Sequence, residues 1–196
     1  MKNKFPFLGI MSGPRKEVMR AWKATLPTTL TRNEIWDIIR ELWQKEEREY
    51  HQLALDWMLT WNIKSFEKSD IEHIYFILNN QSWWDTVDGI AVHLVGKYAK
   101  KFPEEMPRII SEWLAHPSFW LNRTCLIYQL KFKEKTDLGL QQGYIQTLKW
   151  NKEFFIQKAI GWALREYGKS NPELVKTFVN STDLKPLSKK EALKNL

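Results

Sequence analysis

The segment SWWDTVD, residues 82–88, holds the side chains of this chain best suited to chemistry at a partly apolar site. Asp88 follows Trp84 by four residues, so in a helix the two side chains lie on one face. A carboxylate beside an indole acts strongly on a bound ligand, and it is costly to bury without a partner. Two interpretations of Asp88 stay open: a solvated carboxylate on an exposed helix face, or a functional carboxylate at a concave site.

Two later residues can face the same groove. Arg123 lies early in a helix expected after Ser118, and Trp162 lies in the next equivalent helix. Because equivalent helices of a repeat protein stack side by side, both can line one groove with Trp84 and Asp88. Spacing alone does not distinguish this arrangement from a surface ion pair at Arg123 and a core indole at Trp162.

The sequence predicts neither a metal site nor a cofactor. The motifs GxxxxGK[ST], GxGxxG and GxSxG are absent, which argues against bound nucleotides and against a nucleophilic hydrolase. Cys125 is the only cysteine and lies in the apolar run TCLIYQL, so we expect a buried, unreactive thiol in a reducing, cytoplasmic compartment. The histidines lie on different expected helices or loops, without HExxH or H-x-E spacing: His51, His73, His93 and His116.

Composition favours a folded protein with a polyanionic partner. A hydrophobic fraction of 43% with 11 tryptophans excludes a disordered chain. Thirty Lys and Arg against 23 Asp and Glu leave a formal charge of +7 and a pI near 9.4, which favours nucleic acid. The N-terminus lacks the features of a signal peptide, and no segment approaches the roughly 20 apolar residues that span a membrane.

Apolar residues recur at helical spacing along the chain, and no segment shows the alternation of a strand. Residues 31–34, 82–85 and 188–191 each have the pattern of a capping box, and the second of these explains Asp85 as a capping carboxylate. One set of helices is expected to begin near residues 47, 82, 118, 151 and 188. The interleaved set begins near residues 31, 70, 103, 137 and 172.

Within each set the step is roughly 35 residues, the length of a two-helix repeat. The recurring Trp, Gly-Tyr and Ala positions of tetratricopeptide repeats are missing. We therefore expect an all-α fold in one domain, residues 1–196: an α-α superhelix of HEAT/ARM-like type. It should contain about five to six antiparallel helix pairs and a concave basic groove.

Four long motifs add a resemblance to these patterns. The chain resembles the bacterial DNA alkylation repair glycosylases of the AlkD family, which are built from HEAT-like repeats. The similarity runs from FPFLGI to the end of the chain. It is carried by SWWDTVDGI, FWLNRTCLIYQLKFKEKTD, KEFFIQKAIGWALREYGK and PLSKKEALK.

The resemblance implies a DNA glycosylase of base excision repair that needs no cofactor. It would hydrolyse the N-glycosidic bond of cationic N3- and N7-alkylpurines, such as 3-methyladenine and 7-methylguanine, in duplex DNA without flipping the base into a deep pocket. Asp88 would stabilise positive charge on the deoxyribose and orient the attacking water. Trp84 and Trp162 would contact the sugar, while Arg123 and Arg165 would bind the DNA backbone.

The chain also departs from the family. Relatives usually carry another helix before the segment that matches FPFLGI, so we expect part of the DNA-binding rim to be missing or the natural N-terminus to lie upstream. We expect a monomer. Two alternatives stay open: a non-catalytic relative that senses distorted duplex, and a protein-interaction scaffold. The sequence does not rank the alkylpurine lesions.

Overall fold

The computed structural model describes residues 3–196, and this part of the chain contains helices and no strand. Helix α1 (Ser12–Thr25) is followed by five helix pairs, and short 3-10 turns lie at Ile63–Ser65, Pro103–Glu105 and Lys133–Lys135. The first helices of the pairs are α2 (Arg32–Trp43), α4 (Asp70–Asn79), α7 (Met106–Ala115), α9 (Leu138–Leu148) and α11 (Pro172–Ser181). The second helices are α3 (Arg48–Leu59), α5 (Trp84–Gly89) with its continuation, α8 (Phe119–Ile127), α10 (Phe154–Gly168) and α12 (Pro186–Ala192).

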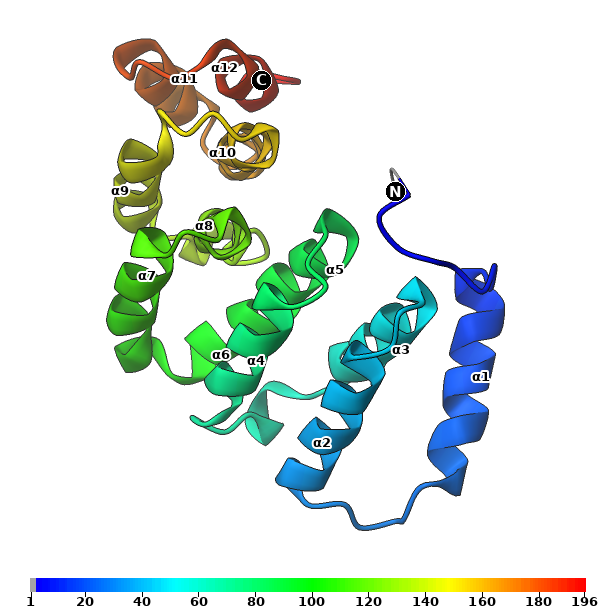
Figure 1. Ribbon diagram of the computed structural model, residues 1–196. Coiled ribbons are helices and arrows are strands. Elements are labelled where there is room, and N and C mark those ends of the chain that lie inside the picture. Colours follow the sequence, from blue (N-terminus) through cyan, green and yellow to red (C-terminus); the bar gives the residue numbers. More distant parts are fainter. Residues whose placement is uncertain (1–2) are drawn as a thin grey trace.

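The pairs follow one another along a C-shaped arc (Figure 1). The second helices begin at residues 48, 84, 119, 154 and 186, so successive starts differ by 36, 35, 35 and 32 residues. These second helices lie on the inner side of the arc and are called the inner helices, while the first helices of the pairs are the outer helices (Figure 1). The inner helices pack in sequence, α3 on α5, α5 on α8, α8 on α10 and α10 on α12. The expected all-α superhelix and its repeat length are confirmed. Helix α1 has no counterpart in the expected set, because it begins without a capping side chain and buries only Met19.

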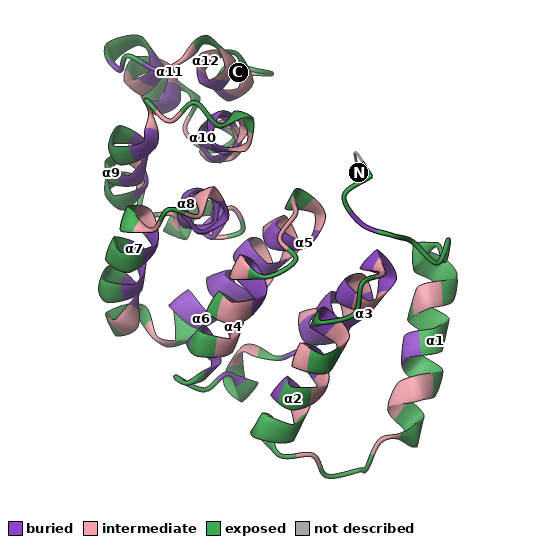
Figure 2. Ribbon diagram, viewed as in Figure 1, coloured by how far each residue is buried: buried purple, intermediate pink, exposed green. Residues whose placement is uncertain are grey.

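The core runs along the arc between the two layers of helices (Figure 2). The apolar stripe expected on α2 buries Ile39 completely, and the stripe on α4 buries Ile74 and Ile77. Each such side chain stabilises the fold by about 1.5–3 kcal/mol through burial. Trp36 and Trp43 are also buried, which explains part of the high tryptophan content. Each pair therefore depends on its neighbours for its core.

The helix starts show where local rules held. The capping box at Thr31 and Glu34 is present, and Asp137 caps α9 by accepting from Leu140 N at 2.9 Å. The expected box at residues 82–85 is wrong, because α5 begins at Trp84 and Asp85 is paired with a buried arginine. The box at residues 188–191 is also wrong, because α12 already begins at Pro186 and Ser188 is buried within it.

The second helix of the α4 pair is long and contains a local irregularity. From α5 it continues through a π segment, η2 (Ile90–Val95), into α6 (Gly96–Lys101). A glycine flanks the π segment at each end. A Cβ at Gly89 would meet a methyl of Leu55 on α3 at 2.9 Å, and one at Gly96 would meet the carbonyl of Tyr128 at 2.9 Å. The two glycines therefore allow the neighbouring inner helices to approach this segment closely.

Two further expectations concern single features. Cys125 is fully buried, and burial raises the pKa of its thiol, so the expected inert core cysteine is confirmed. None of the helices in the described residues is both long and apolar enough to cross a bilayer.

Candidate active site

Asp88 and Arg123 form a two-pronged ion pair between neighbouring inner helices. Arg123 Nε donates to Asp88 Oδ1 at 2.7 Å, and Nη2 donates to Oδ2 at 2.8 Å. The Arg123 side chain is 5% exposed and that of Asp88 is 19% exposed. Asp88 is therefore neither a freely solvated carboxylate nor an unpaired buried one, because a parallel fork of charge-assisted hydrogen bonds fixes its orientation.

The orientation of Arg123 is itself fixed from a third helix. Its Nη1 donates to the carbonyl oxygen of Phe155, at the start of α10, at 2.5 Å. The ring of Phe155 packs against Trp83 and Trp120, with ring centroids 5.3 and 4.9 Å away. These contacts use three of the five N–H groups of the guanidinium. Arg123 is therefore a buried tie between helices, not the surface ion pair that most arginines form.

A pocket beside Asp88 brings two of the expected site residues together. It has a volume of about 290 Å³ and opens to solvent between η2, the loop after α8, and α10. Asp88 and Trp162 line it on different helices. Its complete lining is Asp88, Gly89, Val92, His93, Leu130, Lys131, Trp162 and Glu166. A carboxylate, an indole and basic groups thus share one solvent-exposed hollow.

The two expected indoles differ in their surroundings. Trp162 is partly buried and packs against the core, with its remaining surface in the pocket. Trp84 is 46% exposed and lies outside the pocket lining, one helical turn before Asp88. An indole this exposed at a helix start offers its ring to a ligand that lies across the surface.

Arg165 lies on α10 with its guanidinium turned toward the last helix. Its Nη1 donates to Glu191 Oε2 at 2.8 Å and to Glu191 O at 2.9 Å. Lys158 Nζ contacts the same carboxylate at 2.8 Å, and the two cations lower the Glu191 pKa to about 2. Arg165 also lines a second hollow, about 630 Å³ in volume, which shares Trp162 and Glu166 with the first.

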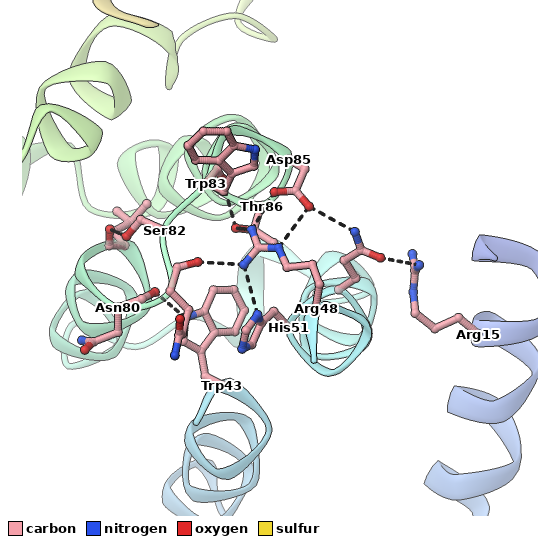
Figure 3. Close-up of polar contacts among 12 residues, drawn as sticks. Arg15, Trp43, Arg48, His51, Asn80, Ser82, Trp83, Asp85 and Thr86 are labelled. Carbon is pink, nitrogen blue, oxygen red and sulfur yellow. Dashed lines mark hydrogen bonds and ion pairs between the residues drawn. The ribbon is translucent and has the colours of Figure 1, made fainter. Parts of the chain in front are cut away.

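A buried arginine that the sequence analysis did not single out fixes the start of α5 (Figure 3). Arg48 is fully buried, and it binds Asp85 through Nη2 at 2.6 Å and Nε at 3.2 Å. Two further hydrogen bonds reach the carbonyl of Gln81 and the hydroxyl of Thr86, each at 2.7 Å. The ion pair spans 37 residues, and Arg48 stands in the charged run QKEEREY, where it looks like a surface residue.

His51 completes this network as a neutral side chain. Arg48 has only donors, so Nδ1 of His51 accepts from Arg48 Nη1 at 3.0 Å and Nε2 donates to Lys45 O at 2.9 Å. Burial, followed by the charge of Arg48, lowers the His51 pKa. Because Trp84 stands next to Asp85, the network positions the indole that the sequence assigns to the site.

Within residues 3–196, no group of three or more His, Cys, Asp or Glu side chains is arranged so that it could hold a metal ion. The charged and titratable side chains that line the Asp88 pocket are two carboxylates, an amine and an imidazole, and the guanidinium of Arg123 binds Asp88 from behind. Such a set can bind a polyanion and place a negative charge beside a developing cation.

A family model described as DNA alkylation repair enzyme matches residues 1–196. The chain belongs to this family of DNA alkylation repair enzymes. It is similar over its whole length to the structure of a predicted DNA alkylation repair enzyme from Enterococcus faecalis, with 32% identity, a TM-score of 0.86 and 90% of that chain covered. No curated protein matches the sequence.

A second solved structure supports the fold alone. The smu.31 protein of Streptococcus mutans is 20% identical, with a TM-score of 0.68, over 94% of this chain and 93% of that one. Family membership supports a role as an enzyme that repairs alkylated DNA. The Asp88 pocket, between η2, the loop after α8 and α10, is the candidate place for that chemistry.

Proposed function

We propose that this member of the DNA alkylation repair family is a DNA glycosylase for cationic N3- and N7-alkylpurines. One observation carries the proposal: Arg123 holds the carboxylate of Asp88 at an open pocket that Trp162 also lines. The chemistry of an alkylpurine needs little more. Alkylation at N3 or N7 leaves a positively charged base, which is a good leaving group without a strong general acid.

Asp88 supplies the negative charge. As the N-glycosidic bond breaks, positive charge develops on the deoxyribose, as in the oxocarbenium-like transition states of glycoside hydrolysis. A fixed carboxylate stabilises that charge without reorganising during the reaction. The fork of Arg123 takes one lone-pair direction on each Asp88 oxygen. The remaining lone pairs can accept from an attacking water and direct it to the sugar.

The two indoles contact the sugar near this carboxylate. Trp162 lines the pocket, and Trp84 is exposed one turn before Asp88. An indole face attracts cations and the polarised C–H bonds of a sugar that gains positive charge. Both rings therefore bind the transition state better than the ground state, which is the condition for catalysis.

The pocket suits a lesion that stays in the duplex. At about 290 Å³ it is open to solvent and lined from three separate elements. Enzymes that extrude a base enclose it between stacking side chains. We propose that this protein instead approaches the lesion from the backbone side, which would allow bulky adducts as substrates.

We propose that Arg123 and Arg165 contact the DNA backbone. Arg123 has two N–H groups beyond those that bind Asp88 and Phe155, and a phosphate that binds them must meet the small exposed part of its side chain, 5% of the whole. Arg165 uses one nitrogen, Nη1, for Glu191 and lies in the hollow next to Trp162. The duplex would then follow the inner helices from α5 to α12.

The test is base release from duplex DNA treated with a methylating agent. We expect the intact protein to release 7-methylguanine and 3-methyladenine, measured by chromatography over several enzyme concentrations. Binding without release would favour a non-catalytic sensor of distorted duplex. Absence of duplex binding even at low salt would favour a protein-interaction scaffold, because phosphate contacts are strongest there.

A further inference from the structure

The π segment after Asp88 brings a histidine to the candidate site. His93 lies five residues after Asp88, and five residues of an α-helix rotate a side chain by about 140°. That rotation would place the two on different faces. The wider turn of the π segment, Ile90–Val95, reduces it, and both side chains line the same pocket. Such π segments are frequent at functional sites.

Two basic side chains, His93 and Lys131, line the pocket, and Lys97 lies close to them. Lys131, on the loop after α8, is exposed and lines the pocket with His93. Lys97, one turn after His93, is held in place because its Nζ donates to Trp61 O at 2.6 Å and Leu59 O at 3.3 Å. No ion pair within residues 3–196 joins any of the three to a carboxylate.

Lys97 and Lys131 place positive charge close to His93. Burial and then the charge of Lys131 lower the pKa of Lys97. Burial, followed by the charges of Lys131 and Lys97, lowers the pKa of His93. Helices α3 and α4 also pack on the π segment, and no charged group on either helix shifts the pKa of His93. Groups that repel one another in this way gain most from an anion between them.

The two carboxylates of the pocket do not supply that anion. Asp88 is bound by Arg123, and Glu166 is bound by Lys169 at 2.7 Å. A bound anion would supply the negative charge that these basic groups lack. On a surface that acts on DNA, the anion at hand beside the lesion is a phosphate of the duplex backbone.

We propose that His93 and Lys131 bind one phosphate of the DNA backbone beside the Asp88 pocket, and that His93 gains a proton when this phosphate is bound. The subsite rests on the proposed function only in requiring duplex DNA in this groove. A phosphate next to the imidazole favours the imidazolium form. In the free protein the His93 pKa lies below the ordinary value of 6.5, and the phosphate raises it, so binding takes up a proton at pH values between the free and the bound pKa. Affinity therefore rises as the pH falls through that range, by up to about tenfold per pH unit.

The first test is binding of an unmodified, fluorescently labelled duplex by anisotropy, from about pH 8.5 to about pH 5.5 at constant ionic strength. We expect wild-type affinity to rise toward acid pH and His93→Gln to lose most of that rise. His116→Gln is the matched control, because His116 lies at the outer face against Tyr75 and should retain the wild-type profile. A His93→Gln profile identical to wild type would overturn the subsite.

The second test is the salt dependence of the same binding. Loss of one phosphate contact reduces the slope of log affinity against log salt by about 0.9. We expect that reduction for Lys131→Gln and no change for Lys149→Gln, at the end of the outer helix α9. An unchanged slope for Lys131→Gln would overturn the subsite. Base release is not part of either readout, so a protein that shows both effects but releases no base would refute the glycosylase proposal alone.

Discussion

Arg123 binds both carboxylate oxygens of Asp88 and, through its third nitrogen, the carbonyl oxygen of Phe155. Asp88 lies on α5, Arg123 on α8 and Phe155 on α10, so one side chain joins three successive inner helices. The position of the candidate catalytic carboxylate therefore depends on how three repeats stack. A change in that stacking would move Asp88 relative to Trp162 on α10.

The ion pair predicts a strong coupling in stability. Arg123→Met leaves the Asp88 carboxylate partly buried without its partner, and we expect a loss of about 3 kcal/mol in the free energy of unfolding. Asp88→Asn with Arg123→Met should cost less than the sum of the two single changes, because the orphaned charge is gone. Urea unfolding of the four proteins measures this coupling. If the losses in the free energy of unfolding simply add, the two side chains are not coupled and the ion pair does not stabilise the contact between the helices.

Replacement by alanine should have opposite effects at two glycines, one at the contact between α10 and α12 and one in open space on α9. A Cβ at Gly161 would lie 2.9 Å from Ser188 O and 3.1 Å from Ala192 N, so Gly161→Ala must displace α12. We expect a loss of about 1–3 kcal/mol. Gly143, on α9, has nothing within 4 Å of an added Cβ, and Gly143→Ala should stabilise by about 0.4–1 kcal/mol. Thermal unfolding measures both effects, and melting temperatures that fall for both variants or rise for both would contradict this account.

Short spacing predicted some local features and missed others, because the capping boxes expected at residues 82–85 and 188–191 are absent. The capping box at Thr31 and Glu34 is present, and α9 begins near residue 137 as expected, with Asp137 as its cap. The step of roughly 35 residues also carried the superhelix, because each repeat must bury the same faces against its neighbours. Asp88 and Trp162 could be placed in one groove for the same reason.

Long-range pairing was the part that spacing could not predict. The spacing indicated that Asp85 is a capping carboxylate, but in the folded protein it binds Arg48, which lies 37 residues earlier in the chain. Arg123 could be assigned to a phosphate or to a surface pair, and only the stacking of α8 on α5 turns it toward Asp88. The π segment that brings His93 to the pocket has no local sequence signal of its own.

The Glu191 carboxylate predicts a pH dependence of stability. Hydrogen bonds from Lys158 and Arg165 lower its pKa from 4.5 to about 2 in the folded protein. Its contribution is therefore present above about pH 4.5 and is lost as the pH falls toward 2. We expect Glu191→Gln to be less stable than wild type at neutral pH, with the difference shrinking in acid. Urea unfolding at a series of pH values measures it, and a difference that does not depend on pH would contradict the assignment.

The central claim is that Asp88 carries the chemistry, and single-turnover release of 7-methylguanine tests it most directly. Asp37→Asn is the matched control, because Asp37 is exposed in the body of the outer helix α2. We predict that Asp88→Asn slows release by about 10²–10³-fold, the usual cost of removing one electrostatic contact to a transition state. Asp37→Asn should keep the wild-type rate. Release by folded Asp88→Asn at the rate of Asp37→Asn would contradict the account.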